Sequence, residues 1–166
     1  MKRIWLFIPL AILMAILGLI FVVYHSLEYE RASPMVGQEM PVWPLVGVEN
    51  GEQGPADLKG QKYILHIGSS WCETCRNEHQ YLEDLAQTGI PLVGLFYKDT
   101  PEDVFSFLEE RSDPYEIVFI DTEGKSMVYL GALALPSTYI VDENGIIQEV
   151  ISGPLQSTHQ VSRFLP

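Results

Sequence analysis

With 166 residues, the chain is long enough for one ordinary domain and an accessory segment. Its 22 acidic residues outnumber the 10 basic ones and give a net charge of −12, which argues against a protein that binds nucleic acid. It contains only two cysteines, Cys72 and Cys75, and their short separation excludes a framework of disulfides that joins distant parts of a fold.

The first feature along the chain is an uncharged apolar run of 21 residues at positions 4–24. As a helix it would extend about 30 Å, the thickness of the hydrocarbon core of a membrane. A cleaved signal peptide is the competing interpretation, but its apolar region is about 7–15 residues long and ends at small residues. This run is longer and has no such end, so we predict an uncleaved transmembrane signal-anchor helix.

Charges on either side of this run predict its orientation. Lys2 and Arg3 precede it, and Glu28, Glu30 and Arg31 follow it. Because basic residues favour the cytoplasmic side, residues 1–3 are predicted to lie in the cytoplasm and the rest of the chain outside it. All 22 acidic residues and eight of the basic ones follow the run, so the outer part carries about −14, which suits a soluble extracytoplasmic domain.

Residues 25–40 are predicted to form a tether and a docking segment, ahead of a redox domain over residues 41–166. Helix is disfavoured in this region by Pro34, Gly37, Pro41 and Pro44. An edge strand is predicted from Val42, Trp43, Leu45 and Val46. Residues 51–60 are predicted to form a loop.

The two cysteines lie between a predicted strand and a predicted helix. The apolar run 63–67 is typical of a buried strand, and the following helical pattern places four residues on one face: His79, Leu82, Leu85 and Ala86. Strand, short turn, Cys-x-x-Cys and helix in this order are typical of a thioredoxin-like fold. The N–H groups and dipole at a helix N-terminus favour a thiolate, so Cys72 is the candidate nucleophile and Cys75 the resolving thiol.

The remaining elements complete an α/β pattern. A second buried strand is predicted at 91–97, parallel to the first because a helix connects them. Thr100 is a suitable N-cap for a helix that begins at Pro101 and has an apolar face of Val104, Phe107 and Leu108. The later predictions are a strand at 116–120, a short helix at 123–130, a hairpin of 137–142 and 146–151 around Asn144-Gly145, and a helix at 157–164. We therefore predict a thioredoxin-like α/β fold with a central mixed sheet flanked by helices.

Two other uses of a Cys-x-x-Cys motif are disfavoured. A structural zinc site needs four ligands, whereas this chain has no second Cys-x-x-Cys and only 4 histidines. Covalent haem attachment requires a histidine directly after the second cysteine, where this chain has Arg76. We therefore expect neither a metal nor a cofactor.

The active-site run narrows the prediction to a family. Residues 71–82, Trp-Cys-Glu-Thr-Cys-Arg-Asn-Glu-His-Gln-Tyr-Leu, resemble the active-site helix of the cytochrome c biogenesis thiol:disulfide interchange proteins, the DsbE/CcmG family. Tyr97-Lys98-Asp99 resembles the end of a strand in that family, and Asn144-Gly145-Ile146-Ile147 resembles its hairpin. The order of anchor, tether and redox domain is similar too.

The resemblance implies a function, a location and partners. The expected protein is anchored in the bacterial inner membrane with its domain in the periplasm, where it reduces the Cys-x-x-Cys-His haem-attachment site of apocytochrome c. Its electrons would come from a membrane thiol reductase, and the haem-ligation complex is a further implied partner. The alternatives are a general periplasmic thiol-disulfide reductase or oxidant and, in another class, a non-catalytic scaffold for apocytochrome or haem ligation.

The resemblance also implies roles near the substrate. Pro136 matches the cis-proline of the family, whose neighbouring backbone receives a substrate strand; the alternative is an ordinary proline at the start of a strand. Trp71 would border the same groove. The preceding loop, residues 131–137, departs from the family because it lacks the usual Gly-Val-x-Gly and has Ser137 where an acidic residue is common.

Three further residues are candidates for tuning the reaction. Glu78 matches an acidic position of the family, although a solvated helix carboxylate is an equal alternative. His66 occupies the position of a buried acidic residue in thioredoxins; it is either an acceptor for the Cys75 proton or a core histidine. Glu73 adds a negative charge beside Cys72, which disfavours its thiolate and predicts a reducing couple.

Overall fold

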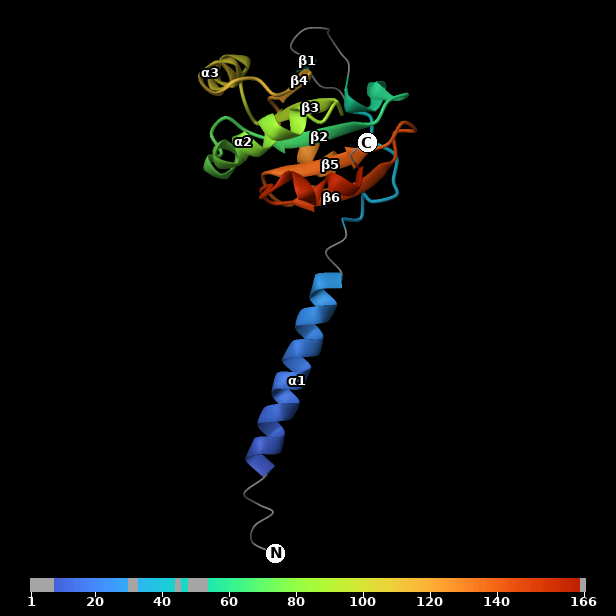
Figure 1. Ribbon diagram of the computed structural model, residues 1–166, viewed down its shortest axis with the longest axis vertical. Coiled ribbons are helices and arrows are strands. Elements are labelled where there is room, and N and C mark those ends of the chain that lie inside the picture. Colours follow the sequence, from blue (N-terminus) through green and yellow to red (C-terminus); the bar gives the residue numbers. More distant parts are fainter. Residues whose placement is uncertain (1–7, 30–32, 44–45, 48–53, 165–166) are drawn as a thin grey trace, which may run out of the picture. The chain divides into compact units, whose positions relative to one another are not determined.

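The computed structural model describes residues 8–29, 33–43, 46–47 and 54–164 (Figure 1). The chain divides into two compact units, Met1–Ala32 and Ser33–Pro166. The second unit begins before residue 41, so residues 33–40 of the predicted tether and docking segment are part of it.

The described residues of the first unit form the helix α1, Ile8–Tyr29. It includes most of the predicted span and continues five residues beyond residue 24, so the first residues of the predicted tether are helical. The physical reason is that the first proline or glycine after residue 24 is Pro34. Within the parts of the chain that the structure describes, no helix has the combination of length and hydropathy required to cross a membrane.

The second unit is built on a mixed six-stranded sheet in the order β1-β4-β3-β2-β5-β6, which can be followed from strand to strand in Figure 1. The strands are β1 (Val46–Gly47), β2 (Tyr63–Gly68), β3 (Leu92–Tyr97), β4 (Ile117–Asp121), β5 (Ser137–Val141) and β6 (Ile147–Ser152). The pairs β2–β3 and β3–β4 are parallel, as predicted for the first two strands, and the other pairs are antiparallel.

Side chains that alternate along β2 enter two different cores, which is why every residue of this strand is buried. Ile64 packs with Leu82 and Leu85 of helix α2 (Glu73–Ala86). Leu65 and Ile67 pack on the other face of the sheet. Helix α3 (Pro101–Arg111) covers the same face as α2 through a third cluster: Phe96, Val104, Phe107, Leu108 and Ile120.

Residues 33–40 are held against the hairpin by backbone hydrogen bonds. The Gly37 N–H donates to the Ile147 carbonyl at 2.8 Å, and the Met40 N–H donates to the Gly145 carbonyl at 2.8 Å. The predicted strand is wrong for Val42 and Trp43, which lie in no strand, and Leu45 lies outside the described residues. Prolines flank this stretch, and Trp43 is instead buried and stacked on Tyr129, 5.8 Å between ring centroids.

The predicted helices form with adjusted ends. The Thr100 side chain caps α3 by accepting from the Asp103 N–H, as predicted. Helix α4 covers only Ser126–Tyr129, because the Asp121 carboxylate fixes the preceding residues in a turn by accepting from three consecutive N–H groups, those of Gly124, Lys125 and Ser126.

Two predicted segments are replaced by short 3₁₀ turns. Pro55–Leu58 forms η2 within the predicted loop 51–60, of which residues 51–53 lie outside the described residues. The predicted helix 157–164 is two turns, η3 (Thr158–Gln160) and η4 (Ser162–Phe164). There the Val161 N–H donates to the Thr158 carbonyl and the Phe164 N–H to the Val161 carbonyl, a three-residue period.

Candidate active site

The cysteine pair lies at the beginning of α2 and forms a disulfide, with 5.3 Å between the two Cα atoms. Cys72 is the N-cap residue, and its Sγ accepts the Cys75 N–H at 3.3 Å. Cys72 is partly exposed, whereas Cys75 is only 4% exposed. Cys72 is therefore the more accessible residue of the pair, and its sulfur receives a backbone donor, whereas Cys75 is buried.

The end of β3 fixes the turn that leads to Cys72. The Ser69 hydroxyl donates to the Tyr97 carbonyl at 2.6 Å, and Trp71 Nε1 donates to the Lys98 carbonyl at 3.1 Å. Lys98 has a φ of 48°, a left-handed conformation that reverses the chain at this point. Trp71 is 60% exposed, so this hydrogen bond orients an aromatic surface beside the disulfide.

Asp99 contributes the strongest contacts to this turn. Its carboxylate accepts the Ser70 N–H at 2.6 Å, the Ser70 hydroxyl at 2.9 Å and the Thr100 N–H at 3.1 Å, and the residue is 3% exposed. In the sequence, Asp99 stands out only as part of a family resemblance. Its position between a strand and an N-cap residue was the available signal, because buried carboxylates at such points cap neighbouring N–H groups.

Pro136 lies next to the strand that leads to the cysteines. The Leu135–Pro136 peptide bond is cis, as the resemblance implies. Ser137 pairs with Ile67 in the sheet, which places the proline loop beside the end of β2. The Pro136 carbonyl accepts the Gly153 N–H at 2.9 Å, and Leu133, in the loop that departs from the family, is 93% exposed.

His66 and Glu78 are brought together beneath the cysteine pair. Both residues are 2% exposed, and His66 Nε2 lies 3.0 Å from Glu78 Oε1. The other oxygen, Glu78 Oε2, accepts the Leu155 N–H at 2.6 Å. The solvated carboxylate considered for Glu78 is therefore wrong, because the side chain is buried and both of its oxygens have partners.

Tyr115 extends this network and was missed in the sequence. Its hydroxyl lies 2.9 Å from His66 Nδ1, across 49 residues of chain. Burial, and secondarily the charge of Glu78, raise the pKa of Tyr115 well above its usual value, so the phenol stays protonated. No local pattern marks this residue, although Gly94 gives a partial signal. A β-carbon at Gly94 would lie 2.9 Å from the Tyr115 ring, so the glycine makes room for it.

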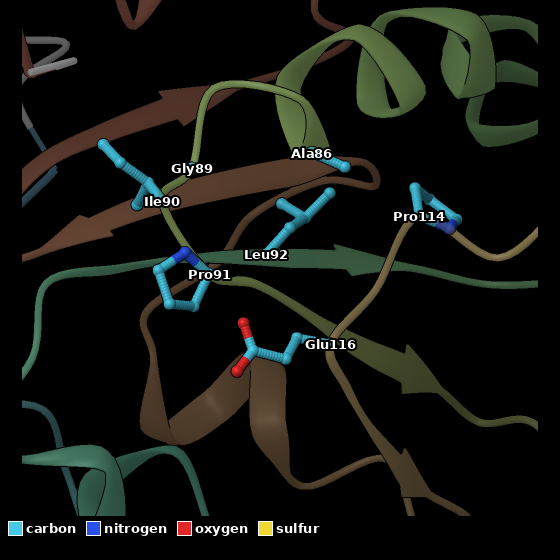
Figure 2. Close-up of a pocket in the computed structure, with 7 residues that line it drawn as sticks. All are labelled: Ala86, Gly89, Ile90, Pro91, Leu92, Pro114 and Glu116. Atoms are coloured by element: carbon cyan, nitrogen blue, oxygen red, sulfur yellow. The ribbon is translucent and has the colours of Figure 1, made fainter.

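A separate pocket lies away from the cysteines. Figure 2 shows its seven lining residues, with the Glu116 side chain at its edge; they enclose about 130 Å³. Leu92 begins β3 there, whereas Cys72 follows the other end of the parallel strand β2. The pocket is thus at the opposite end of these strands from the cysteines.

Among the described residues, no group of three or more histidine, cysteine or acidic side chains could hold a metal ion.

Comparison with known proteins agrees with this geometry. The Redoxin family model matches residues 35–164. The thiol:disulfide interchange protein DsbE of Escherichia coli (strain K12) is 36% identical over 163 residues, which cover 93% of this chain and 88% of the relative. DsbE of Pseudomonas aeruginosa is 32% identical over 155 residues, with 92% and 86% covered. The chain belongs to the DsbE family.

Solved structures show the same fold at lower identity. The thioredoxin domain of a thiol-disulfide oxidoreductase from Bacteroides vulgatus superposes with a TM-score of 0.65 and 18% identity, over 79% of this chain and 98% of that one. A thio-disulfide isomerase from Thermus thermophilus gives 0.64 and 20%, over 78% and 94%. The predicted thioredoxin-like fold is confirmed, and this DsbE-family protein is a thiol-disulfide oxidoreductase.

Proposed function

We propose that this DsbE-family protein is a membrane-anchored reductase of the periplasm, which reduces the disulfide in the Cys-x-x-Cys-His haem-attachment site of apocytochrome c. The observation that carries the proposal is the asymmetry of the cysteine pair, with an accessible Cys72 and a buried Cys75. A protein that only bound apocytochrome would not need one sulfur exposed and the other sheltered at a helix N-terminus.

The reaction follows from this arrangement in two steps. The Cys72 thiolate attacks one sulfur of the substrate disulfide, which forms a mixed disulfide and releases the other substrate sulfur as a thiolate. Cys75 then loses its proton and attacks the Cys72 sulfur, which forms the Cys72–Cys75 disulfide and releases the second substrate thiolate. A membrane thiol reductase supplies the two electrons that regenerate the dithiol.

The substrate groove is assigned to Trp71 and the loop at Pro136. The exposed indole is fixed by its hydrogen bond to the Lys98 carbonyl. In the proline loop, the Pro136 carbonyl already accepts a hydrogen bond from the Gly153 N–H. A substrate strand would therefore pair with the backbone that precedes the proline. The exposed Leu133 places an apolar side chain in this loop. It favours a substrate that is an unfolded segment with apolar residues near the substrate's own cysteines.

Anchoring by α1 is part of the proposal. Its large apolar side chains from Ile12 to Val22 are about half exposed or more, and the segment contains no charged residue. Protease added to spheroplasts should digest the redox domain. A protected domain, or a mature N-terminus that begins after residue 24, would contradict the proposed topology.

Activity and substrate are tested by two variants. A chain with Cys72→Ala and Cys75→Ala should fail to support cytochrome c maturation unless an external thiol is added. Full maturation with this chain would favour the scaffold instead. A Cys75→Ser chain should trap apocytochrome c as a mixed disulfide, whereas a mixture of unrelated periplasmic proteins would indicate a general thiol-disulfide enzyme.

A further inference from the structure

A buried chain of hydrogen bonds joins three side chains behind Cys75. Tyr115 Oη lies 2.9 Å from His66 Nδ1, and His66 Nε2 lies 3.0 Å from Glu78 Oε1. The Tyr115 and His66 rings are also nearly parallel, with 6.0 Å between their centroids. The three residues come from α2, β2 and the loop before β4, so the network exists only in the folded chain.

The positions of the protons follow from the partners. The Glu78 carboxylate accepts the Leu155 N–H on one oxygen and the His66 Nε2–H on the other. His66 Nδ1 therefore carries the lone pair and accepts the hydroxyl of Tyr115. Because burial raises the pKa of Tyr115, that hydroxyl remains a donor under ordinary conditions.

The Cε1–Nδ1 edge of His66 and the side chain of Cys75 both lie next to Gly68. A β-carbon on Gly68 would lie 3.0 Å from His66 Cε1, 3.6 Å from His66 Nδ1 and 3.7 Å from Cys75 Cβ. The absence of a side chain at Gly68 thus leaves the imidazole edge and Cys75 beside the same small gap. The titratable groups around His66 are Glu78, Cys75 and His79 on α2, and Tyr115 in the loop before β4.

We propose that Tyr115 is a positioning residue for the second step of the reaction, in which His66 accepts the Cys75 proton. The proton passes from the Cys75 thiol to His66 Nδ1, and the Tyr115 hydroxyl turns from donor to acceptor for the new N–H. A hydroxyl can fill both roles, which a phenylalanine cannot. The Glu78 carboxylate balances the imidazolium, and the Cys75 thiolate closes the disulfide with Cys72.

This inference rests on the proposed roles of Cys72 and Cys75, and the test separates the two steps. Reduced protein is mixed with an equal amount of an aromatic disulfide reagent whose released thiolate is coloured. The first thiolate reports attack by Cys72, and the second reports resolution by Cys75. Both rates are measured in a stopped-flow instrument across a range of pH, at matched amounts of folded protein.

The test variant is Tyr115→Phe, and Tyr63→Phe is its matched control. Tyr63 is another buried tyrosine, but its hydroxyl donates to the Pro55 carbonyl at 2.8 Å and does not contact His66. Tyr115→Phe should keep the first rate, slow the second about tenfold at neutral pH and change its pH profile. Tyr63→Phe should keep both rates. His66→Asn, which cannot take up the proton, should slow the second step further.

The outcomes distinguish the inference from the proposed function. Wild-type second-step rates and pH profiles in Tyr115→Phe, or equal slowing in Tyr63→Phe, would overturn the inference and leave the reductase intact. A wild-type protein that releases no thiolate at all would refute the proposed function itself. If Tyr115→Phe does not fold, His66→Asn decides: an unchanged second step in that variant also overturns the inference.

Discussion

The two sulfurs of the disulfide have different surroundings, although only two residues separate them. Around Cys72, the partners are backbone groups and an exposed indole, held by the end of β3. Behind Cys75, the side chains are buried and ionisable, and they bond mainly to one another. The outer region controls access and the direction of approach, whereas the inner region contains the groups that can hold a proton.

This difference indicates how one short motif performs two unlike steps. The first step needs a thiolate that a protein substrate can reach, so its stabilisation comes from N–H groups that need no proton transfer. The second step needs a thiol that loses its proton only after the mixed disulfide has formed, away from water. Four predictions test this division, from the largest expected effect to the smallest.

The division predicts that two serine variants both lose turnover but differ in whether a mixed disulfide accumulates. Cys72→Ser should abolish reduction of a protein disulfide such as that of insulin, because no accessible nucleophile remains. Cys75→Ser should also lose turnover, but it should accumulate a stable mixed disulfide through Cys72. Mass spectrometry of the non-reduced product measures this difference. A stable adduct on Cys75 in the Cys72→Ser chain would reverse the assignment.

The turn at Asp99 should matter for the outer region in particular. Asp99→Asn removes the charge that accepts two N–H groups and a hydroxyl, and should lower the free energy of unfolding by about 1–3 kcal/mol. Asp121→Asn is the matched control, since Asp121 is similarly buried and its carboxylate also caps three N–H groups, none of which belongs to the turn before Cys72.

Urea unfolding should show comparable losses in these two variants. The rate of the first thiol exchange step should fall several-fold in Asp99→Asn alone. Equal exchange rates in the two variants would mean that the turn does not control Cys72.

His79 supplies a pH prediction, because it is a buried histidine without a counter-ion on its free nitrogen. Burial is the main cause that lowers its pKa, and it outweighs the raising effect of the hydrogen bond to the Ser112 carbonyl. Among the described residues, its Nδ1 has no hydrogen-bond partner. The folded protein therefore holds His79 neutral where the unfolded chain would protonate it.

The sign of the effect follows from proton binding. As the pH falls through about 6.5, the unfolded state binds more protons at this residue than the folded state, so stability decreases. His79→Gln, whose amide can still donate to Ser112, should reduce that decrease by up to about 1.4 kcal/mol per pH unit. Urea unfolding at several pH values measures it, and an unchanged slope would contradict the neutral state of His79.

The smallest effect is expected at Glu73, which is exposed in the first turn of α2. Its carboxylate opposes a thiolate on Cys72, whereas a cation there would stabilise the reduced form. Glu73→His should therefore make the couple more oxidising by tens of millivolts, where about 30 mV corresponds to about 1.4 kcal/mol. Equilibration of both proteins with glutathione measures the shift, and equal potentials would remove Glu73 as a determinant.

The sequence was sufficient to predict the helices and strands around the site, but not the buried contacts behind Cys75. Apolar runs bounded by glycine and proline predicted β2, β3 and the hairpin, and the cysteine spacing predicted where α2 begins. Tyr115 contacts His66, which is 49 residues away in the sequence, and the Leu155 N–H donates to Glu78, which is 77 residues away. Such contacts depend on how the sheet and loops pack, which a local pattern does not contain.

The reduction potential of the wild-type protein tests the central claim most directly. A reductant of apocytochrome c must have a couple more negative than that of its substrate. Equilibration with glutathione and quantification of the free thiols should give a potential nearer to that of thioredoxin, about −270 mV, than to that of DsbA, about −120 mV. A value near −120 mV would contradict the reductase and identify the protein as an oxidant of thiols.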